Sequence, residues 1–196
     1  MGDVIPLYQR FLGQNSLFLS IAAGKTIAVL EDYLATDAKI IRAMPNTPAA
    51  IGKGITVACG NNGVTAQDQE TALRLLQAVG DALWIEDEAH MNAVTAVSGS
   101  GPAYIFLLIE TLANAGIEAG LSKDMATKLA RQTVIGSAAL AEDACDTPAS
   151  TLRENVTSPG GTTAAALEVL MNKTAGLQPL MDKAILAAKT RGQELE

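Results

Sequence analysis

The segment Asn155-Val-Thr-Ser-Pro-Gly-Gly-Thr-Thr163 has the composition of an anion-binding turn at the start of a helix. Gly160 and Gly161 lack side chains, Pro159 fixes one φ angle, and an apolar helix is expected to follow directly. The N–H groups of a first helical turn have no partners within the helix, so they can bind a carboxylate, and each charge-assisted hydrogen bond contributes about 1.5–3 kcal/mol. The helix dipole adds to this attraction without any Lys or Arg. Taken alone, such a segment is more often an ordinary capped helix start, so the chemical interpretation depends on further motifs.

Two other segments are expected to end neighbouring strands and to form a second site. Ser20-Ile-Ala-Ala-Gly24 follows one apolar strand, and Arg42-Ala-Met-Pro-Asn-Thr-Pro48 follows the next. The carboxyl ends of neighbouring parallel strands lie side by side, and α/β sheets bind nucleotides in the crevice outside these ends. These segments therefore predict the walls of a site for the nicotinamide end of a nucleotide. A third segment, Ala96-Val-Ser-Gly-Ser-Gly-Pro-Ala-Tyr104, carries Gly99 and Gly101, which allow a close backbone approach.

The elements that position these segments follow from hydrophobic periodicity and capping residues. Up to about Ser98 the sequence alternates between strands and helices. The predicted strands are 17–22, 39–43, 54–58 and 82–86, and the predicted helices are 27–34, capped by Thr26, and 66–79, capped by Thr65, with a turn at Gly80-Asp81. Because helical crossovers separate strands, we expect a largely parallel sheet.

After Ser98 the sequence predicts helices alone. They are 104–115, a longer helix capped by Ser122 and ending near 141, a short one in which Thr147 is the cap and Pro148 the first helical residue, one ending near 171, and a last one from Leu177 onward. Their faces are apolar and rich in small residues, and helices of this kind usually pair with another surface. We therefore expect this half to be a helical dimerisation domain.

The composition excludes several classes of protein. A length of 196 residues, with 48% apolar and 18% charged residues, excludes a disordered chain, and a net charge of -7 argues against a general nucleic-acid binder. Cys59, Cys145 and the single His90 cannot form a disulfide framework or a three-ligand zinc site, so no metal is expected. No unbroken apolar stretch approaches the ~20 residues of a membrane helix, and no secretion signal is recognised, so we expect a soluble, cytoplasmic protein.

Taken together, the three motifs resemble pyrroline-5-carboxylate reductase, the last enzyme of proline synthesis. The resemblance runs from about Leu17 to Glu196, and the stretch from Leu152 to Leu167 is similar to the family signature. It implies a partial Rossmann-type NAD(P)-binding domain over residues 1–98, followed by an all-α helical dimerisation and substrate-binding domain over 99–196. It also implies an oxidoreductase that reduces 1-pyrroline-5-carboxylate to L-proline with NADPH or NADH, and a homo-oligomer that is at least a dimer.

The resemblance also implies roles for individual residues. The family's substrate loop falls on Val156, Ser158, Gly160, Gly161 and Thr163, whose N–H groups would bind the substrate carboxylate. Thr163 is in addition the candidate catalytic residue, because its hydroxyl is expected near the ring nitrogen. The segments that line the nicotinamide and its ribose fall on Ala23, Gly24, Asn46, Thr47 and Pro48. Hydride transfer to a protonated imine needs alignment more than a strong acid or base.

The sequence departs from the family at its amino end. The first strand and the G-x-G-x-x-G/A turn that binds the pyrophosphate have no counterpart, so we expect the first mononucleotide half to be absent. The strand at Leu17–Ala22 then becomes an apolar edge, which we expect to be covered by another chain or by a helix over Asp3–Leu12. Two alternatives stay open: a catalytically impaired paralogue or fragment that acts as an oligomerisation partner, and a different Rossmann reductase with a helical dimer domain.

Overall fold

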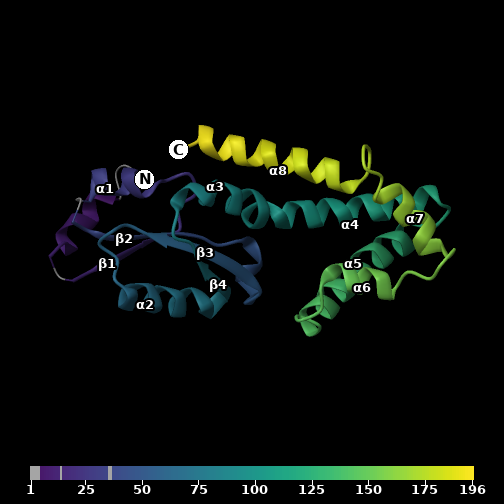
Figure 1. The fold of residues 1–196 in the computed structure, drawn as a ribbon, viewed down its shortest axis with the longest axis horizontal. Coiled ribbons are helices and arrows are strands. Elements are labelled where there is room, and N and C mark those ends of the chain that lie inside the picture. The colour runs from purple at the N-terminus through teal and green to yellow at the C-terminus, as the bar shows by residue number, and fades with distance from the viewer. Residues whose placement is uncertain (1–4, 14, 35–36) are drawn as a thin grey trace. The chain divides into compact units, whose positions relative to one another are not determined.

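The computed structural model describes residues 5–13, 15–34 and 37–196, which divide into two units (Figure 1). The first unit contains the described residues up to Pro102 together with Ile185–Glu196, and the second unit is Ala103–Ala184. All the strands of the described residues belong to the first unit. Residues 185–196, which the sequence groups with the helical half, cluster with this sheet-bearing unit.

Four strands form one mixed sheet in the order β1 (Leu17–Ser20), β2 (Lys39–Met44), β3 (Gly54–Gly60) and β4 (Gly80–Trp84). β1 pairs with β2 and β3 pairs with β4 in parallel, but β2 and β3 are antiparallel. The expectation of a largely parallel sheet is therefore wrong at the centre of the sheet. Only the 3-10 helix η2 (Thr47–Ile51) joins β2 to β3, whereas a parallel pair needs a crossover of about a dozen residues or more.

β2 forms the centre of the core, with helices on both faces of the sheet. Ile40 and Ile41 are both fully buried, and as consecutive strand residues they face opposite sides. Ile40 belongs to one apolar cluster with Leu30 of α1 (Ile27–Tyr33), and Ile41 belongs to another with Leu76 of α2 (Ala66–Leu76). This double burial fixes the strand whose carboxyl end leads into the predicted nicotinamide wall.

Local signals set the starts of both helices, as predicted. The Thr26 hydroxyl accepts a hydrogen bond from Val29 N at 3.3 Å, and Thr65 forms a capping box with Asp68. After α2 comes the 3-10 helix η3 (Gln77–Val79), and β4 begins directly at Gly80, so the predicted turn at Gly80-Asp81 is wrong. A side chain at Gly80 would overlap the backbone of Gly54, so this glycine serves strand contact rather than a turn.

The chain leaves the sheet through the 3-10 helix η4 (Glu88–His90), α3 (Met91–Val94), the π-helix η5 (Thr95–Gly99) and α4 (Gly101–Glu118). Then follow α5 (Lys123–Asp143), α6 (Ala149–Asn155), α7 (Thr162–Leu170) and α8 (Leu177–Glu194). Ser122 caps α5 as predicted, through a bond from Met125 N. Thr147 does not cap α6, because Pro148 has an extended ψ of 139° and is itself the residue before the helix.

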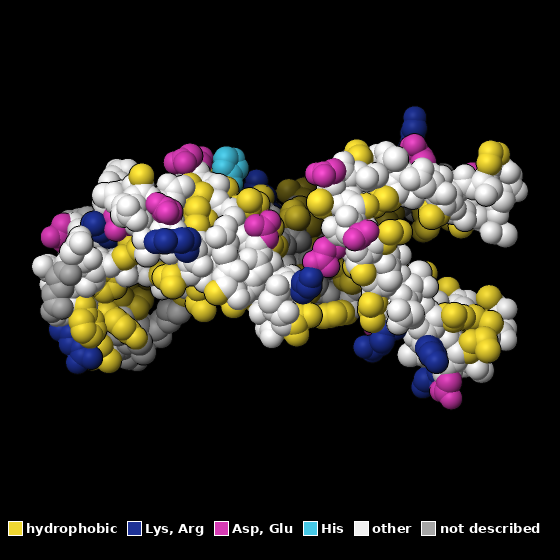
Figure 2. Space-filling model, turned by 90° about the horizontal axis from the view of Figure 1, so that it is seen from below, with side chains coloured by type: hydrophobic (Ala, Val, Ile, Leu, Met, Phe, Trp, Pro, Cys, Tyr) yellow, Lys and Arg dark blue, Asp and Glu magenta, His cyan; other side chains and the backbone are white. Residues whose placement is uncertain are grey.

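The helical unit exposes much of its apolar surface. Its buried residues are small ones, among them Ala113, Ala126 and Ala130, whereas Phe106 and Leu129 are 64% and 51% exposed. Figure 2 shows such hydrophobic side chains on the molecular surface. By length and composition alone, the helical stretch Glu88–Glu118 could cross a membrane, and only 11% of its apolar window is buried. Counting unbroken apolar residues misses this stretch because Asn, Ser and Gly interrupt it.

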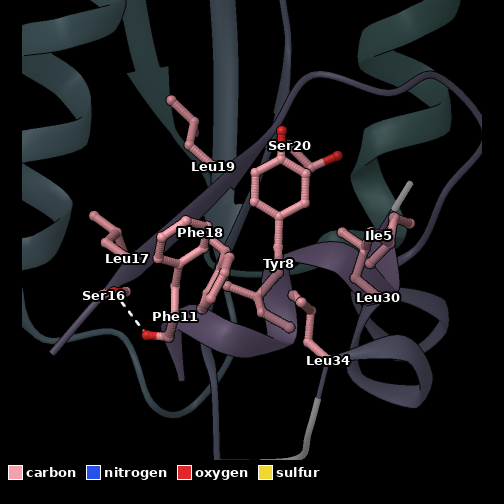
Figure 3. Close-up of a pocket in the computed structure, with 11 residues that line it drawn as sticks. Ile5, Tyr8, Phe11, Ser16, Leu17, Phe18, Leu19, Ser20, Leu30 and Leu34 are labelled. Atoms are coloured by element: carbon pink, nitrogen blue, oxygen red, sulfur yellow. Dashed lines mark hydrogen bonds between the residues drawn. The ribbon is translucent and has the colours of Figure 1, made fainter. Parts of the chain in front are cut away.

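At the other end of the described chain, the 3-10 helix η1 (Ile5–Phe11) takes the place of the predicted helix over Asp3–Leu12, of which Asp3 and Val4 lie outside the described residues. Tyr8 and Phe11 of η1 help to line an apolar cavity of about 800 Å³ with residues of β1 and α1. Figure 3 shows Phe11 facing Phe18 of β1 there. Among the described residues, β1 has no strand on its outer side.

Candidate functional site

α6 carries the chain into the predicted anion-binding turn. Val156 follows α6 as its C-cap, and its side chain is 63% exposed. Thr157 bonds back to the helix twice: its N–H donates to Glu154 O at 2.9 Å, and its hydroxyl donates to Arg153 O at 2.6 Å. These two bonds fix the direction in which the chain leaves α6.

Ser158–Gly161 then forms a tight turn. The Gly161 N–H donates to Ser158 O at 3.0 Å, so in this conformation that N–H is not available to a ligand. Gly160 has a φ of +68°, in the left-handed region that favours glycine. Apart from its chain neighbours, no atom of the described residues lies within 4 Å of the position that a Cβ on Gly160 would occupy, so its surroundings there are open.

The turn ends on the first turn of α7, for which Gly161 is the N-cap. Ala165 N donates to Gly161 O at 3.2 Å, which closes the first helical turn. The N–H groups of Thr162, Thr163 and Ala164 precede that bond and so have no acceptor within the helix. Thr163 is half-buried, and its hydroxyl belongs to the same turn. Three N–H groups without helical acceptors and the positive end of the helix dipole therefore lie at the start of α7, an arrangement of the kind that binds carboxylates.

The first unit brings the two predicted nicotinamide walls together. The parallel register pairs Ser20 with Arg42, so the segments that follow β1 and β2 begin side by side, as predicted. Gly24 has a φ of +67°, and Leu195 O lies 3.4 Å from the position that a Cβ on Gly24 would occupy. Ala23 is exposed. The loop after β1 thus presents small residues, with the chain that follows α8 packed against it.

The loop after β2 has a structural residue at its start. The Asn46 carboxamide oxygen accepts a hydrogen bond from Ile55 N at 2.9 Å, which closes the connection from β2 to β3. Thr47 is exposed and Pro48 is half-buried in the first turn of η2. The loop after β1 thus carries a glycine at positive φ, and the loop after β2 carries Thr47 and Pro48; their contact with a nicotinamide stays a prediction.

The third motif supports the same wall through a different contact. The π-helix η5 closes with a bond from Ser100 N to Thr95 O at 2.8 Å. A Cβ on Gly99 would lie 2.8 Å from the methyl carbon of Met44, so Gly99 receives the tip of a side chain from β2 rather than the close backbone approach predicted there. At Gly101 no described atom lies within 4 Å of the Cβ position, so the close approach predicted there is not found.

Sequence reasoning missed an ionic cluster beneath the walls. Arg42 is a buried residue, and its Nη1 lies 2.7 Å from Glu88 Oε1 and 3.1 Å from Glu196 Oε1. Burial and the nearby Glu88 carboxylate raise the pKa of Cys59 to about 11, against the opposing effect of Arg42. No local pattern reveals the cluster, because Arg42 and Glu88 lie 46 positions apart.

Comparisons with known proteins agree on one family. The family model for pyrroline-5-carboxylate reductase dimerisation matches residues 88–195. A pyrroline-5-carboxylate reductase of Mycobacterium leprae is 46% identical over 197 residues, covering 92% of this chain and 66% of the relative. One of Pseudomonas aeruginosa is 45% identical and likewise covered over 66% of its length. The chain thus spans about two thirds of the length of these curated relatives.

Solved structures extend the similarity to the fold. The structure of a pyrroline-5-carboxylate reductase from Coxiella burnetii matches with a TM-score of 0.92 and 38% identity, covering all of this chain and 72% of the other. A pyrroline carboxylate reductase structure from Plasmodium falciparum, with NADP bound, matches with a TM-score of 0.83 and 33% identity over 99% of this chain and 72% of the other.

Proposed function

The chain belongs to the pyrroline-5-carboxylate reductase family, and on this premise we propose that it reduces 1-pyrroline-5-carboxylate to L-proline with NADPH or NADH. The observation that carries the proposal is the start of α7. Three N–H groups without helical acceptors, preceded by the Gly160-Gly161 turn, form a site for a small organic carboxylate. Preorganised hydrogen-bond donors at such a site stabilise charge without a basic residue.

The substrate is held at the carboxylate and aligned at the imine. Val156, Ser158, Gly160 and Gly161 shape the turn, and the first N–H groups of α7 bind the carboxylate. Thr163 places its hydroxyl at the ring nitrogen and orients the imine carbon. The chain therefore contributes alignment, and it needs no strong acid or base for this reaction.

The cofactor site is formed by Ala23, Gly24, Asn46, Thr47 and Pro48, with Asn46 acting through the turn that it closes. When bound, the nicotinamide cofactor supplies the hydride that the reduction consumes. These residues bind the nicotinamide and its ribose, and the small side chains allow the ring to lie flat against the strand ends. A relative with NADP bound supports the choice of cofactor.

We further propose a homo-oligomer, at least a dimer, formed through the helical unit. The exposed apolar side chains of that unit and the matching dimerisation model support this assembly. A cytoplasmic location fits a reductase of this kind and stays a prediction.

The test combines binding with turnover. NADPH is titrated into the purified chain while its fluorescence is followed, and its oxidation is then measured with added 1-pyrroline-5-carboxylate. Saturable binding and substrate-dependent oxidation are expected, and Thr163→Ala should lower turnover while the circular dichroism spectrum stays unchanged. Absence of both binding and oxidation in the unaltered chain would leave an oligomerisation partner as the better interpretation.

A further inference from the structure

Arg42 is a buried cation that depends on specific partners. Its side chain is 4% exposed, and burying a guanidinium without compensation is strongly unfavourable. Its Nη1 donates to Glu88 Oε1 at 2.7 Å and to Glu196 Oε1 at 3.1 Å. Both carboxylates are only partly exposed, at 28% and 25% of the side chain, so solvent screens these contacts less than it screens a surface pair.

Glu88 also holds the start of α1. The same Oε1 atom accepts a hydrogen bond from Ile27 N at 2.9 Å, and Ile27 is the first residue of that helix. A single carboxylate oxygen therefore joins the end of β2 to the start of α1. Glu88 comes from η4, after the last strand, so the link is made by a residue outside both segments.

The two segments joined in this way lead directly into the proposed nicotinamide walls. Gly24 precedes Ile27 by three positions, and Asn46 follows Arg42 by four. The third group of the cluster, Glu196, follows α8, whose neighbouring Leu195 lies against Gly24. Beyond the pairing of β1 with β2, contacts that meet at Arg42 and Glu88 therefore join the segments that lead into the two walls.

We propose that Glu88 and Arg42 are positioning residues that hold the Ala23–Gly24 loop and the Asn46–Pro48 loop at the separation needed for the nicotinamide, a role that rests on the proposed function. Neither side chain needs to touch the cofactor. A displacement of about 1 Å in such walls is enough to change a hydride-transfer rate by orders of magnitude.

The test starts from Glu88→Gln, which keeps a carbonyl oxygen for Ile27 N but removes the nearer of the two carboxylate charges that compensate Arg42. Backbone hydrogen exchange is measured on the full chain by mass spectrometry. We expect residues 23–27 and 46–50 to exchange about tenfold faster or more, because one partner of a buried pair is left uncompensated. The matched control is Glu86→Gln, since Glu86 is an exposed carboxylate two positions away, and it should leave both loops unchanged.

A second variant separates positioning from stability and covers the case in which Glu88→Gln does not fold. Arg42→Met combined with Glu88→Gln removes the buried guanidinium and the Glu88 charge and leaves only the partly exposed Glu196 carboxylate, and replacing a buried ion pair in this way often restores stability. We expect a melting temperature close to that of the unaltered chain, with fast exchange retained in both loops. Slow exchange in this double variant would show that the pair serves stability alone and would overturn the proposal.

Kinetics give an independent readout. In a folded variant that lacks the Arg42–Glu88 pair, we expect the KM for NADPH to rise and kcat to fall. The KM for 1-pyrroline-5-carboxylate should change less than about twofold, because the pair lies outside the turn that binds this substrate. Equal exchange in Glu88→Gln and Glu86→Gln would refute the positioning role. An unaltered chain without cofactor binding would instead refute the proposed function, and the exchange comparison would still decide the role of the pair.

Discussion

Replacing Gly160 by Ala tests whether the bare turn before α7 is the substrate cradle. Gly160 has a φ of +68°, and no atom of the part of the chain that the structure describes lies within 4 Å of its Cβ position, its chain neighbours aside, so the added methyl group meets no steric obstacle there. The only cost is that of the left-handed conformation for an L-residue, which is about 1–2 kcal/mol. In Gly160→Asn the cost should be smaller, because Asn tolerates this region better.

Whether the Gly160→Ala substitution lowers the melting temperature or the affinity for proline depends on whether the turn can relax before the ligand binds. Within the turn, the bond from Gly161 N to Ser158 O, at 3.0 Å, holds the conformation, and the turn is exposed. An alanine there should therefore relax locally without lowering the melting temperature. Binding of a carboxylate then has to restore the left-handed conformation, so affinity should fall about 5–30-fold, the factor that corresponds to one or two kcal/mol.

The assay is calorimetric titration with L-proline at constant pH and salt. Affinity should decrease in the order of the unaltered chain, Gly160→Asn and Gly160→Ala, while thermal melting stays nearly constant. Gly136→Ala is the matched control, because Gly136 lies in the interior of α5 and its Cβ position is also free of neighbours. It should bind proline normally and gain up to about 1 kcal/mol of stability. Equal affinity for proline in Gly160→Ala and Gly136→Ala would refute the cradle.

Three further predictions concern other parts of the molecule. Hydrogen bonds from Thr65 lower the pKa of Asp68 to about 2, so the stabilising effect of its carboxylate is complete above the unfolded pKa of about 3.9 and is lost as the pH falls towards 2. The difference in melting temperature between the unaltered chain and Asp68→Asn should therefore vanish at low pH, and a constant difference would contradict this. Burial, together with Glu88, raises the pKa of the Cys59 thiol to about 11, whereas Cys145 is exposed. A thiol reagent at pH 8 should therefore label Cys145 quickly, and Cys145→Ser should abolish that fast phase. A fast phase that persists in this variant would show that Cys59 is accessible. Light scattering at micromolar concentration should give a mass of at least two chains, and a monodisperse monomer would exclude assembly through the helical unit.

The parts of the fold that follow from neighbouring residues were predictable from the sequence. Thr26, Thr65 and Ser122 each cap a helix within three positions, so their signals are local. The antiparallel pairing of β2 and β3 was not predicted, because the sequence reading assumed a helical crossover where η2 gives only a short connection. The direction of a strand depends on the length and shape of such a connection, which hydrophobic periodicity does not report.

The site shows the same division. The Ser158–Gly161 turn and the first turn of α7 could be predicted from the sequence, because two glycines stand directly before a helix start. The cluster around Arg42 could not be predicted. It joins β2 to η4 and to the residue at 196 that follows α8, and no rule of sequence spacing connects those positions. Buried ion pairs of this kind become visible only when the fold brings their partners together.

The outer side of β1 has a consequence for handling the protein. Among the described residues β1 is an edge strand, so in the chain as described its outward N–H and C=O groups can template a strand from another molecule, and Leu19 on the same strand is 37% exposed. Concentrated solutions should therefore be prone to edge-to-edge aggregation. A lysine in place of Leu19 would act as a gatekeeper, since its charge makes such addition unfavourable while the hydrogen bonds to β2 remain.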